Sequence, residues 1–147
     1  MKHRAEGGRR PMPASLVFVL ALLGSAAVAG IASVAVLYRQ DAAQARTSAE
    51  ALTGGNVKAG QIAITRYTCG ACHQIPGIPG ADGRVGPALA GVGVRAQIAG
   101  VLTNDPTNMI RWLRTPQQVL PGNGMPDQGI SERDARDIAA YLYTLKR

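Results

Sequence analysis

The chain has 147 residues, which allows one domain of ordinary size plus an appendage. Its aromatic residues are one Trp, four Tyr and one Phe, so a small domain built from it needs a large apolar group to complete its core. The formal net charge is +7, but the basic residues are scattered along the sequence, which argues against a nucleic-acid-binding protein.

The N-terminal region divides into a basic stretch and an apolar one. Residues 1–13 carry four basic side chains against one acidic side chain, and residues 14–38 contain no charged side chain. A helix over Ala14–Leu37 spans about 36 Å, which suffices to cross a hydrocarbon core of about 30 Å. The basic flank places the N-terminus in the cytoplasm and the rest of the chain in the periplasm of a bacterial inner membrane.

A cleaved signal peptide is the alternative to this transmembrane anchor, with Ala43–Ala45 as the cleavage site. The apolar region of a signal peptide has about 7–15 residues, so the longer one here favours a retained anchor. Residues 39–56 follow as a polar, Ala-rich tether without an apolar stripe, partly helical and then flexible at Gly54 and Gly55. The folded domain is expected over residues 57–147.

Three helices are predicted within this domain. The first runs into the cysteine motif and places four side chains on one face: Gly60, Ala63, Ile64 and Tyr67. A short second helix begins at Pro106 and stops before Pro116. The last helix begins after the N-cap Ser131, with acidic residues in its first turn. No stretch alternates convincingly as a strand, so the domain is predicted to be all-α with long Gly- and Pro-rich loops.

The segment TCGACH holds both cysteines of the chain, Cys69 and Cys72, followed directly by His73. A thioredoxin-like dithiol needs a βαβ setting, which the sequence lacks. A structural zinc site needs four ligands, but the chain has two Cys and two His, and His3 lies across the predicted membrane. The spacing C-x-x-C-H instead indicates a covalently attached haem c, with each thiol bonded to one vinyl group and His73 beneath the iron.

From Val57 to Leu145 the sequence resembles the class I cytochromes c, with a helix ending in C-x-x-C-H, then Gly-Pro-x-Leu, a middle helix, a Met-bearing loop and a C-terminal helix. The resemblance implies an all-α fold of about three to five helices wrapped around one covalently bound haem, here preceded by one transmembrane helix. It also implies that the carbonyl of Pro87, in VGPAL, accepts a hydrogen bond from Nδ1–H of His73, which would make the ligand more electron-donating.

A methionine is the expected sixth ligand of the iron. Two of the four methionines precede the membrane span, which leaves Met109 and Met125. Met109 falls inside the predicted middle helix, where methionine more often fills the core. Met125 falls in PGNGMPD, whose glycines let the backbone approach a flat ring and whose Pro126 stiffens the loop. Ligation by His73 and Met125 fills both axial positions, which suits a one-electron carrier and not a catalyst.

Three side chains of the middle helix are candidates for contact with the haem propionates. They are Trp112 and the neighbouring Arg111 and Arg114, because partly buried carboxylates need hydrogen-bond donors. The alternative is that Trp112 is an ordinary core residue and that the arginines are solvated.

A second resemblance covers residues 99–126, which look like the cytochrome c domain fused to subunit II of some bacterial haem–copper oxidases. The expected function is therefore a membrane-anchored monohaem cytochrome c that passes single electrons from a quinol-oxidising complex to a terminal oxidase. A mildly basic surface would meet an acidic docking patch on such redox partners, including dehydrogenases. The alternatives are a subunit through which electrons enter an oxidase or dehydrogenase complex, and a ligand-binding or peroxidase-like haem protein.

Overall fold

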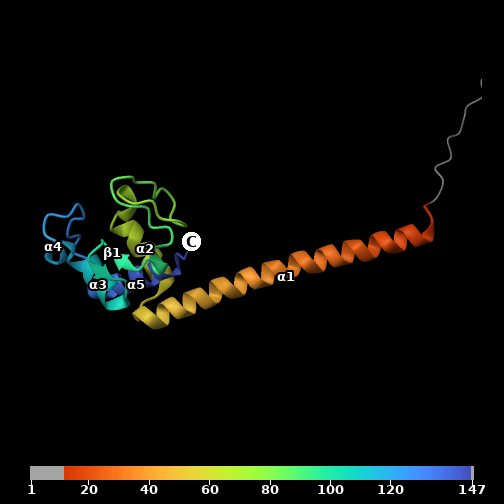
Figure 1. Ribbon diagram of the computed structural model, residues 1–147, viewed down its shortest axis with the longest axis horizontal. Helices are drawn as coiled ribbons and strands as arrows, with labels where there is room; N and C mark the ends of the chain where they lie inside the picture. The colour runs from red at the N-terminus through yellow and green to blue at the C-terminus, as the bar shows by residue number, and fades with distance from the viewer. Residues whose placement is uncertain (1–11, 147) are drawn as a thin grey trace, which may run out of the picture. The chain divides into compact units, whose positions relative to one another are not determined.

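The computed structural model describes residues 12–146 (Figure 1). The chain divides into two compact units between Gln40 and Asp41. The longest element, the helix α1, covers Ala14–Thr53 and contributes residues to both units. Among the described residues, α1 is the one helix long and apolar enough to cross a membrane, and its most apolar window has a mean hydropathy of 2.3. The N-terminal part of α1 therefore fits a transmembrane anchor.

The sequence predicts a polar tether over residues 39–56, partly helical and then flexible at Gly54 and Gly55, whereas the structure packs its helical part into the second unit. The helix continues to Thr53, and both Ala49 (2% exposed) and Thr53 (1% exposed) are buried in the second unit. Gly55 lies so close to the backbone of Arg136 that an added Cβ would be 2.2 Å from its carbonyl oxygen. Small side chains and backbone make this contact, which is why the sequence shows no apolar stripe there.

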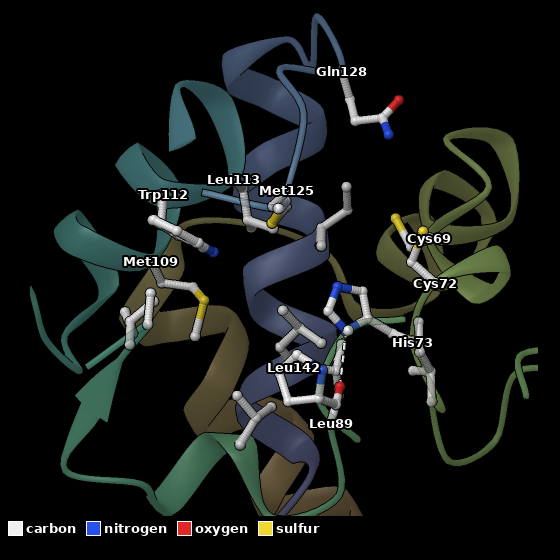
Figure 2. A pocket seen from close by; sticks show the side chains of 18 of the residues that line it. Cys69, Cys72, His73, Leu89, Met109, Trp112, Leu113, Met125, Gln128 and Leu142 are labelled. Carbon is white, nitrogen blue, oxygen red and sulfur yellow. Dashed lines mark hydrogen bonds between the residues drawn. The ribbon is translucent and has the colours of Figure 1, made fainter. Parts of the chain in front are cut away.

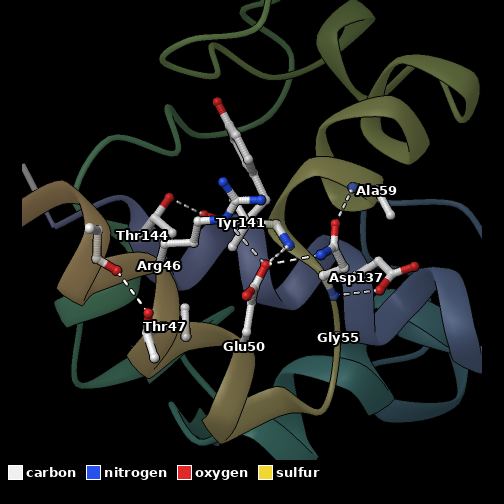
Figure 3. A network of polar contacts seen from close by, with 12 residues as sticks. Arg46, Thr47, Glu50, Gly55, Ala59, Asp137, Tyr141 and Thr144 are labelled. Atoms are coloured by element: carbon white, nitrogen blue, oxygen red, sulfur yellow. Dashed lines mark hydrogen bonds and ion pairs between the residues drawn. The ribbon is translucent and has the colours of Figure 1, made fainter. Parts of the chain in front are cut away.

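Polar groups close the corner between α1 and the next helix, α2 (Val57–Arg66) (Figure 3). The carboxylate of Glu50 accepts hydrogen bonds from the backbone N of Val57 (2.9 Å) and from Nδ2 of Asn56 (3.1 Å). The backbone N of Asn56 donates to Oδ1 of Asp137, 2.6 Å away. The last turns of α1 are thus a packed part of the second unit.

The second unit is mainly helical, as predicted. Three of its helices have an N-cap residue whose side chain accepts a hydrogen bond from a backbone N–H of the first turn. These residues are Asn56, Asp105 and Ser131. After α2 come, in chain order, the 3-10 turns η1 (Cys69–Ala71) and η2 (Val92–Val94) and the helices α3 (Pro106–Arg114), α4 (Pro116–Val119) and α5 (Glu132–Thr144).

A small β-hairpin lies before α3 and was not predicted. Its strands are β1 (Gln97–Ile98) and β2 (Leu102–Thr103), which pair antiparallel with Ile98 opposite Leu102. Two-residue strands are too short to show an alternating pattern in a sequence. The fold remains all-α in character, as expected for a class I cytochrome c.

The helices α2 and α5 pack against each other at the centre of the second unit. Gly60 permits this approach, because an added Cβ would lie 2.0 Å from the carbonyl oxygen of Asp137. On either side of the crossing, Ala63, Ile64 and Ile138 are each 1% exposed. The crossing fixes the end of α2, and hence the position of the cysteine motif that follows it.

Candidate functional site

The buried side chains of the second unit surround a cavity of about 420 Å³, within the usual range for a ligand pocket (Figure 2). Its walls come from α2, the cysteine motif, the loop before α3, α3 itself, the loop after α4, and α5. Most lining side chains are apolar, and several belong to the core of the domain: Ile64, Met109, Leu113, Ile138 and Leu142.

The cysteine motif forms one wall of this cavity. Thr68, between the end of α2 and η1, has a left-handed conformation (φ 51°), which is rare for a β-branched residue. Cys69, Cys72 and His73 all line the cavity, and Figure 2 shows them coming from the same stretch of chain. Cys69 is half-buried, and burial raises the pKa of its thiol.

His73 is held by Pro87 and its neighbour Gly86. Its Nδ1 lies 2.8 Å from the carbonyl oxygen of Pro87, the hydrogen bond that the resemblance implied. A carbonyl can only accept, so Nδ1 carries a proton in this hydrogen bond, and in the neutral imidazole Nε2 is then the nitrogen with the lone pair. Gly86 makes the approach possible, because an added Cβ would lie 2.3 Å from Cε1 of the imidazole.

Both candidate methionines line the cavity, from different elements. Met109 lies in α3 and is 2% exposed, whereas Met125 lies in the loop after α4 and is half-buried. Figure 2 shows the two side chains near Trp112 and Leu113, which also line the cavity. The backbone N of Met125 donates to Oδ1 of Asn123 at 2.7 Å.

The structure separates the three propionate candidates. Trp112 lines the cavity, but Arg111 is exposed and is not one of the described residues that line it. Helix periodicity explains the difference, because neighbouring residues point about 100° apart around α3. Arg114 is also exposed, and its Nη1 lies 3.5 Å from a carboxylate oxygen of Glu132.

Arg95 lines the cavity and was missed from the sequence. Its Nη2 donates to the carbonyl oxygens of Ala88 (2.5 Å) and Ala90 (2.9 Å), which holds the guanidinium against the loop after Pro87. The signal that could have found it is that Arg95 is the one charged residue between Pro87 and Asp105.

The residues around the cavity fit a covalently bound haem. Two thiols offer the attachment points, and the imidazole of His73 faces the same space. The remaining walls are largely apolar, as a macrocycle requires, and Arg95 and Trp112 are lining residues whose side chains carry N–H donors.

The sequence pattern of the cytochrome c family matches residues 57–146. The chain belongs to the cytochrome c family. It is a class I c-type cytochrome, whose domain implies electron transfer and a covalent haem c, and Cys69 and Cys72 are its two cysteines.

Individual relatives fall into two groups. Over 88 residues the chain is 38% identical to a cytochrome c oxidase subunit 2 of Alkalihalophilus pseudofirmus and 35% identical to that of Bacillus sp. PS3. These matches cover 59% and 57% of this chain, and 25% of each relative. The chain is also 35% identical over 105 residues to a cytochrome c2 of Rhodoblastus acidophilus, covering 63% of this chain and 94% of the relative. No solved structure matches the chain.

The chain therefore spans about a quarter of the length of the oxidase subunits and nearly the whole of a cytochrome c2. This chain, the oxidase subunits and the cytochrome c2 are thus similar over the cytochrome c domain of this chain.

Proposed function

We propose that this cytochrome c is held to the outer face of the bacterial cytoplasmic membrane by the N-terminal part of α1 and carries single electrons there. The observation that carries the proposal is the meeting of His73 and Met125 on one apolar cavity beside the thiols of Cys69 and Cys72. With His73 and Met125 both bound to the iron, substrates would be kept off it, which favours electron transfer over catalysis.

The proposed ligand set assigns a task to each residue. Cys69 and Cys72 hold the haem through thioether bonds, and Nε2 of His73 and the sulfur of Met125 bind the iron. The bound haem supplies a one-electron iron(III)/iron(II) couple. The hydrogen bond from His73 to Pro87 fixes the imidazole tautomer and strengthens electron donation, while a thioether ligand raises the reduction potential relative to a second histidine.

Arg95 and Trp112 are the proposed contacts for the haem propionates. Both line the cavity, and the guanidinium and the indole N–H can each donate to a carboxylate. The requirement for a donor is physical, because a carboxylate in a mostly apolar wall is costly unless it is paired.

A terminal oxidase is the proposed electron acceptor, and a quinol-oxidising complex the proposed donor. The similarity to cytochrome c oxidase subunit 2 supports an oxidase, although it covers a quarter of those subunits. The same similarity favours the second candidate, a subunit through which electrons enter such a complex. From Arg39 onward the chain has twelve basic and eight acidic residues, which suits a partner with an acidic docking patch.

The ligand proposal is tested by two matched variants, Met125→Leu and Met109→Leu. Each keeps the side-chain volume and removes one sulfur, a change that usually costs less than about 1.5 kcal/mol. The ferric native protein is expected to show the weak red charge-transfer band of a sulfur–iron bond. Met125→Leu should abolish this band and let carbon monoxide bind the ferrous form, whereas Met109→Leu should retain it.

A native protein that lacks the band and binds carbon monoxide readily would sink the proposal and point to a ligand-binding haem protein. Loss of the band in Met109→Leu alone would move the ligand to α3.

A further inference from the structure

The segment that carries Met125 has little regular structure of its own. The loop over residues 120–130 connects α4 to α5 and contains Gly122, Gly124 and Gly129. Gly122 has a positive φ of 78°, and a Cβ added at Gly124 would meet nothing within 4 Å. Glycines leave a backbone many conformations, so specific contacts must select the one observed.

The side chain of Gln117, in α4, contacts this loop at three backbone positions. Its Nε2 donates to the carbonyl oxygens of Asn123 (2.9 Å) and Met125 (2.7 Å). Its Oε1 accepts from the backbone N of Gly122 at 3.1 Å. The amide of one side chain thus uses both of its donors and an acceptor site on a single loop.

The backbone of Gln117 adds a fourth contact, since its N–H donates to Oδ1 of Asp127 at 3.1 Å. The residues bonded to Gln117 therefore lie on both sides of Met125 in the sequence. Gln117 itself follows Pro116, one of the largest fully buried side chains of the protein. We call these hydrogen bonds between Gln117 and the loop the Gln117 brace. They start next to Pro116, which is fixed in the core.

Asn123 completes the arrangement from within the loop. Its Oδ1 accepts from the backbone N of Met125, while its Nδ2 donates to the carbonyl oxygens of Pro116 (2.9 Å) and Leu120 (2.6 Å). Both backbone polar groups of Met125 are thereby occupied, its N–H by Asn123 and its carbonyl by Gln117. Without the Gln117 amide, Met125 would keep one of these two restraints.

We propose that Gln117 is the positioning residue for Met125, holding the loop over residues 120–130 closed so that the methionine sulfur stays on the iron. The inference rests on the proposed function, in which Met125 is the sixth ligand. Gln117 acts through the backbone of the loop and touches no reacting atom. Its amide carries no charge, so the brace works by hydrogen-bond geometry alone.

The test uses the haem-loaded full chain and measures carbon monoxide binding to the ferrous form. When methionine occupies the iron, carbon monoxide must wait for the sulfur to leave, so the rate reaches a plateau at high carbon monoxide. That plateau reports how often the loop opens. For Gln117→Ala we expect the plateau to rise about tenfold or more, since three contacts with the loop are lost.

The reduction potential gives a second readout that a merely structural role would not move. If the ferric sulfur bond is weakened tenfold more than the ferrous one, the potential rises by about 59 mV. Gln117→Glu has the same size and keeps the acceptor for Gly122, but it sets a carboxylate oxygen against the carbonyls of Asn123 and Met125. It should therefore raise the plateau as well, which excludes lost volume as the cause.

Gln118→Ala is the matched control, because Gln118 is the exposed neighbour in α4 and its side chain makes no hydrogen bond within residues 12–146. Its plateau and potential should equal those of the native protein. Gln117 variants that match the native protein, or a Gln118→Ala variant that opens as fast as they do, would overturn the inference.

The two proposals fail differently. A native protein whose carbon monoxide rate rises linearly without a plateau has no methionine ligand, and both the ligand proposal and the role of Gln117 then fall. A native plateau that Gln117→Ala leaves unchanged overturns the brace alone, with Met125 retained as the ligand.

Discussion

Two glycines set how closely the chain wraps around the cysteine motif. An added Cβ at Gly83 would lie 2.4 Å from the carbonyl oxygen of Ala71. The backbone N of Gly83 donates to the carbonyl of Gly70 at 3.0 Å, and that of Gly86 to the carbonyl of Cys72 at 2.8 Å. The loop that delivers the Pro87 carbonyl to the imidazole is therefore fastened to the motif by its backbone.

A single carboxylate links the end of α2 to the start of α5. Tyr67 donates its hydroxyl proton to Oδ2 of Asp134 at 2.8 Å, Ser131 donates to the same oxygen at 3.0 Å, and Nη1 of Arg66 lies 3.5 Å from Oδ1. The hydrogen bond from Tyr67, followed by that from Ser131, lowers the pKa of Asp134 below its ordinary value of 3.8.

We expect Asp134→Asn to destabilise the domain in a pH-dependent way. A carboxylate with a lowered pKa stabilises the fold fully above pH 3.8, and this contribution disappears as the pH falls below 3.8 through the folded-state pKa. At pH 7 the loss should be about 1 kcal/mol, or about 4–8 °C in Tm for a domain of this size. Thermal melts of both proteins at pH 7 and near pH 3 would measure it.

The difference in Tm between Asp134→Asn and the native protein should shrink at the lower pH. Asp82→Asn is a suitable control, because Asp82 is exposed and its carboxylate makes no hydrogen bond in the described part of the chain. A difference of the same size at both pH values would contradict the role given to the charge.

At the residue scale, the sequence predicted the side chains that haem attachment requires at a short, fixed spacing. It missed the side chains whose role is to hydrogen-bond to the backbone of a loop. Cys69, Cys72 and His73 form a recognisable unit because haem attachment demands their separation. Arg95 and Gln117 act on carbonyl oxygens and amide N–H groups that every residue has. The isolated charge of Arg95 could have drawn attention to that residue, but no residue type marks the backbone partners themselves in advance.

At the scale of the elements, the main difference from the prediction is that the end of α1 is packed into the domain and not a free tether. Ala49 and Thr53 are buried in the second unit, but such small side chains give the end of α1 no amphipathic signal. The short α4 was likewise invisible as a separate element, since Pro116 begins it directly after α3 ends at Arg114. The three longer helices of the domain had caps and apolar faces, and they were found where expected.

We predict that a haem-loaded fragment starting at Asp41 is more stable than one starting at Val57. The shorter fragment lacks the N-cap Asn56, which typically contributes about 1 kcal/mol, and the buried contacts of Ala49 and Thr53. Together these losses should lower the free energy of unfolding by about 2 kcal/mol. Chemical denaturation of the two fragments, followed by circular dichroism, gives the comparison.

A pair of substitutions in the longer fragment separates docking from mere helix length. Ala49→Glu places a charge in the contact and should reduce stability to near that of the shorter fragment, whereas Ser48→Glu, on the exposed side of α1, should not. Equal midpoints for the two fragments would show that the end of α1 contributes nothing.

The whole chain combines a helix suited to a membrane with a domain similar to part of cytochrome c oxidase subunit 2 and to a cytochrome c2. If α1 is a retained anchor with a cytoplasmic N-terminus, the haem-stained full chain should sediment with membranes. Protease added to intact spheroplasts should then digest the domain, while inverted vesicles should protect it. A fragment from Asp41, exported behind a cleavable signal peptide, should be soluble.

The reverse protection pattern would contradict the orientation, and haem-stained full chain in the soluble fraction would contradict the anchor itself.

The side chains that fill the centre of the domain are the same ones that surround the cavity. Ile138, Met109, Leu113 and Leu142 all belong both to the hydrophobic core and to the cavity wall. Mutations that improve packing here will also change the dielectric and the water access that set the redox potential. Adaptation to a hotter environment and adaptation to a different redox partner therefore involve substitutions at the same few positions. A substitution that raises the stability of the domain will also change its redox potential, and the reverse.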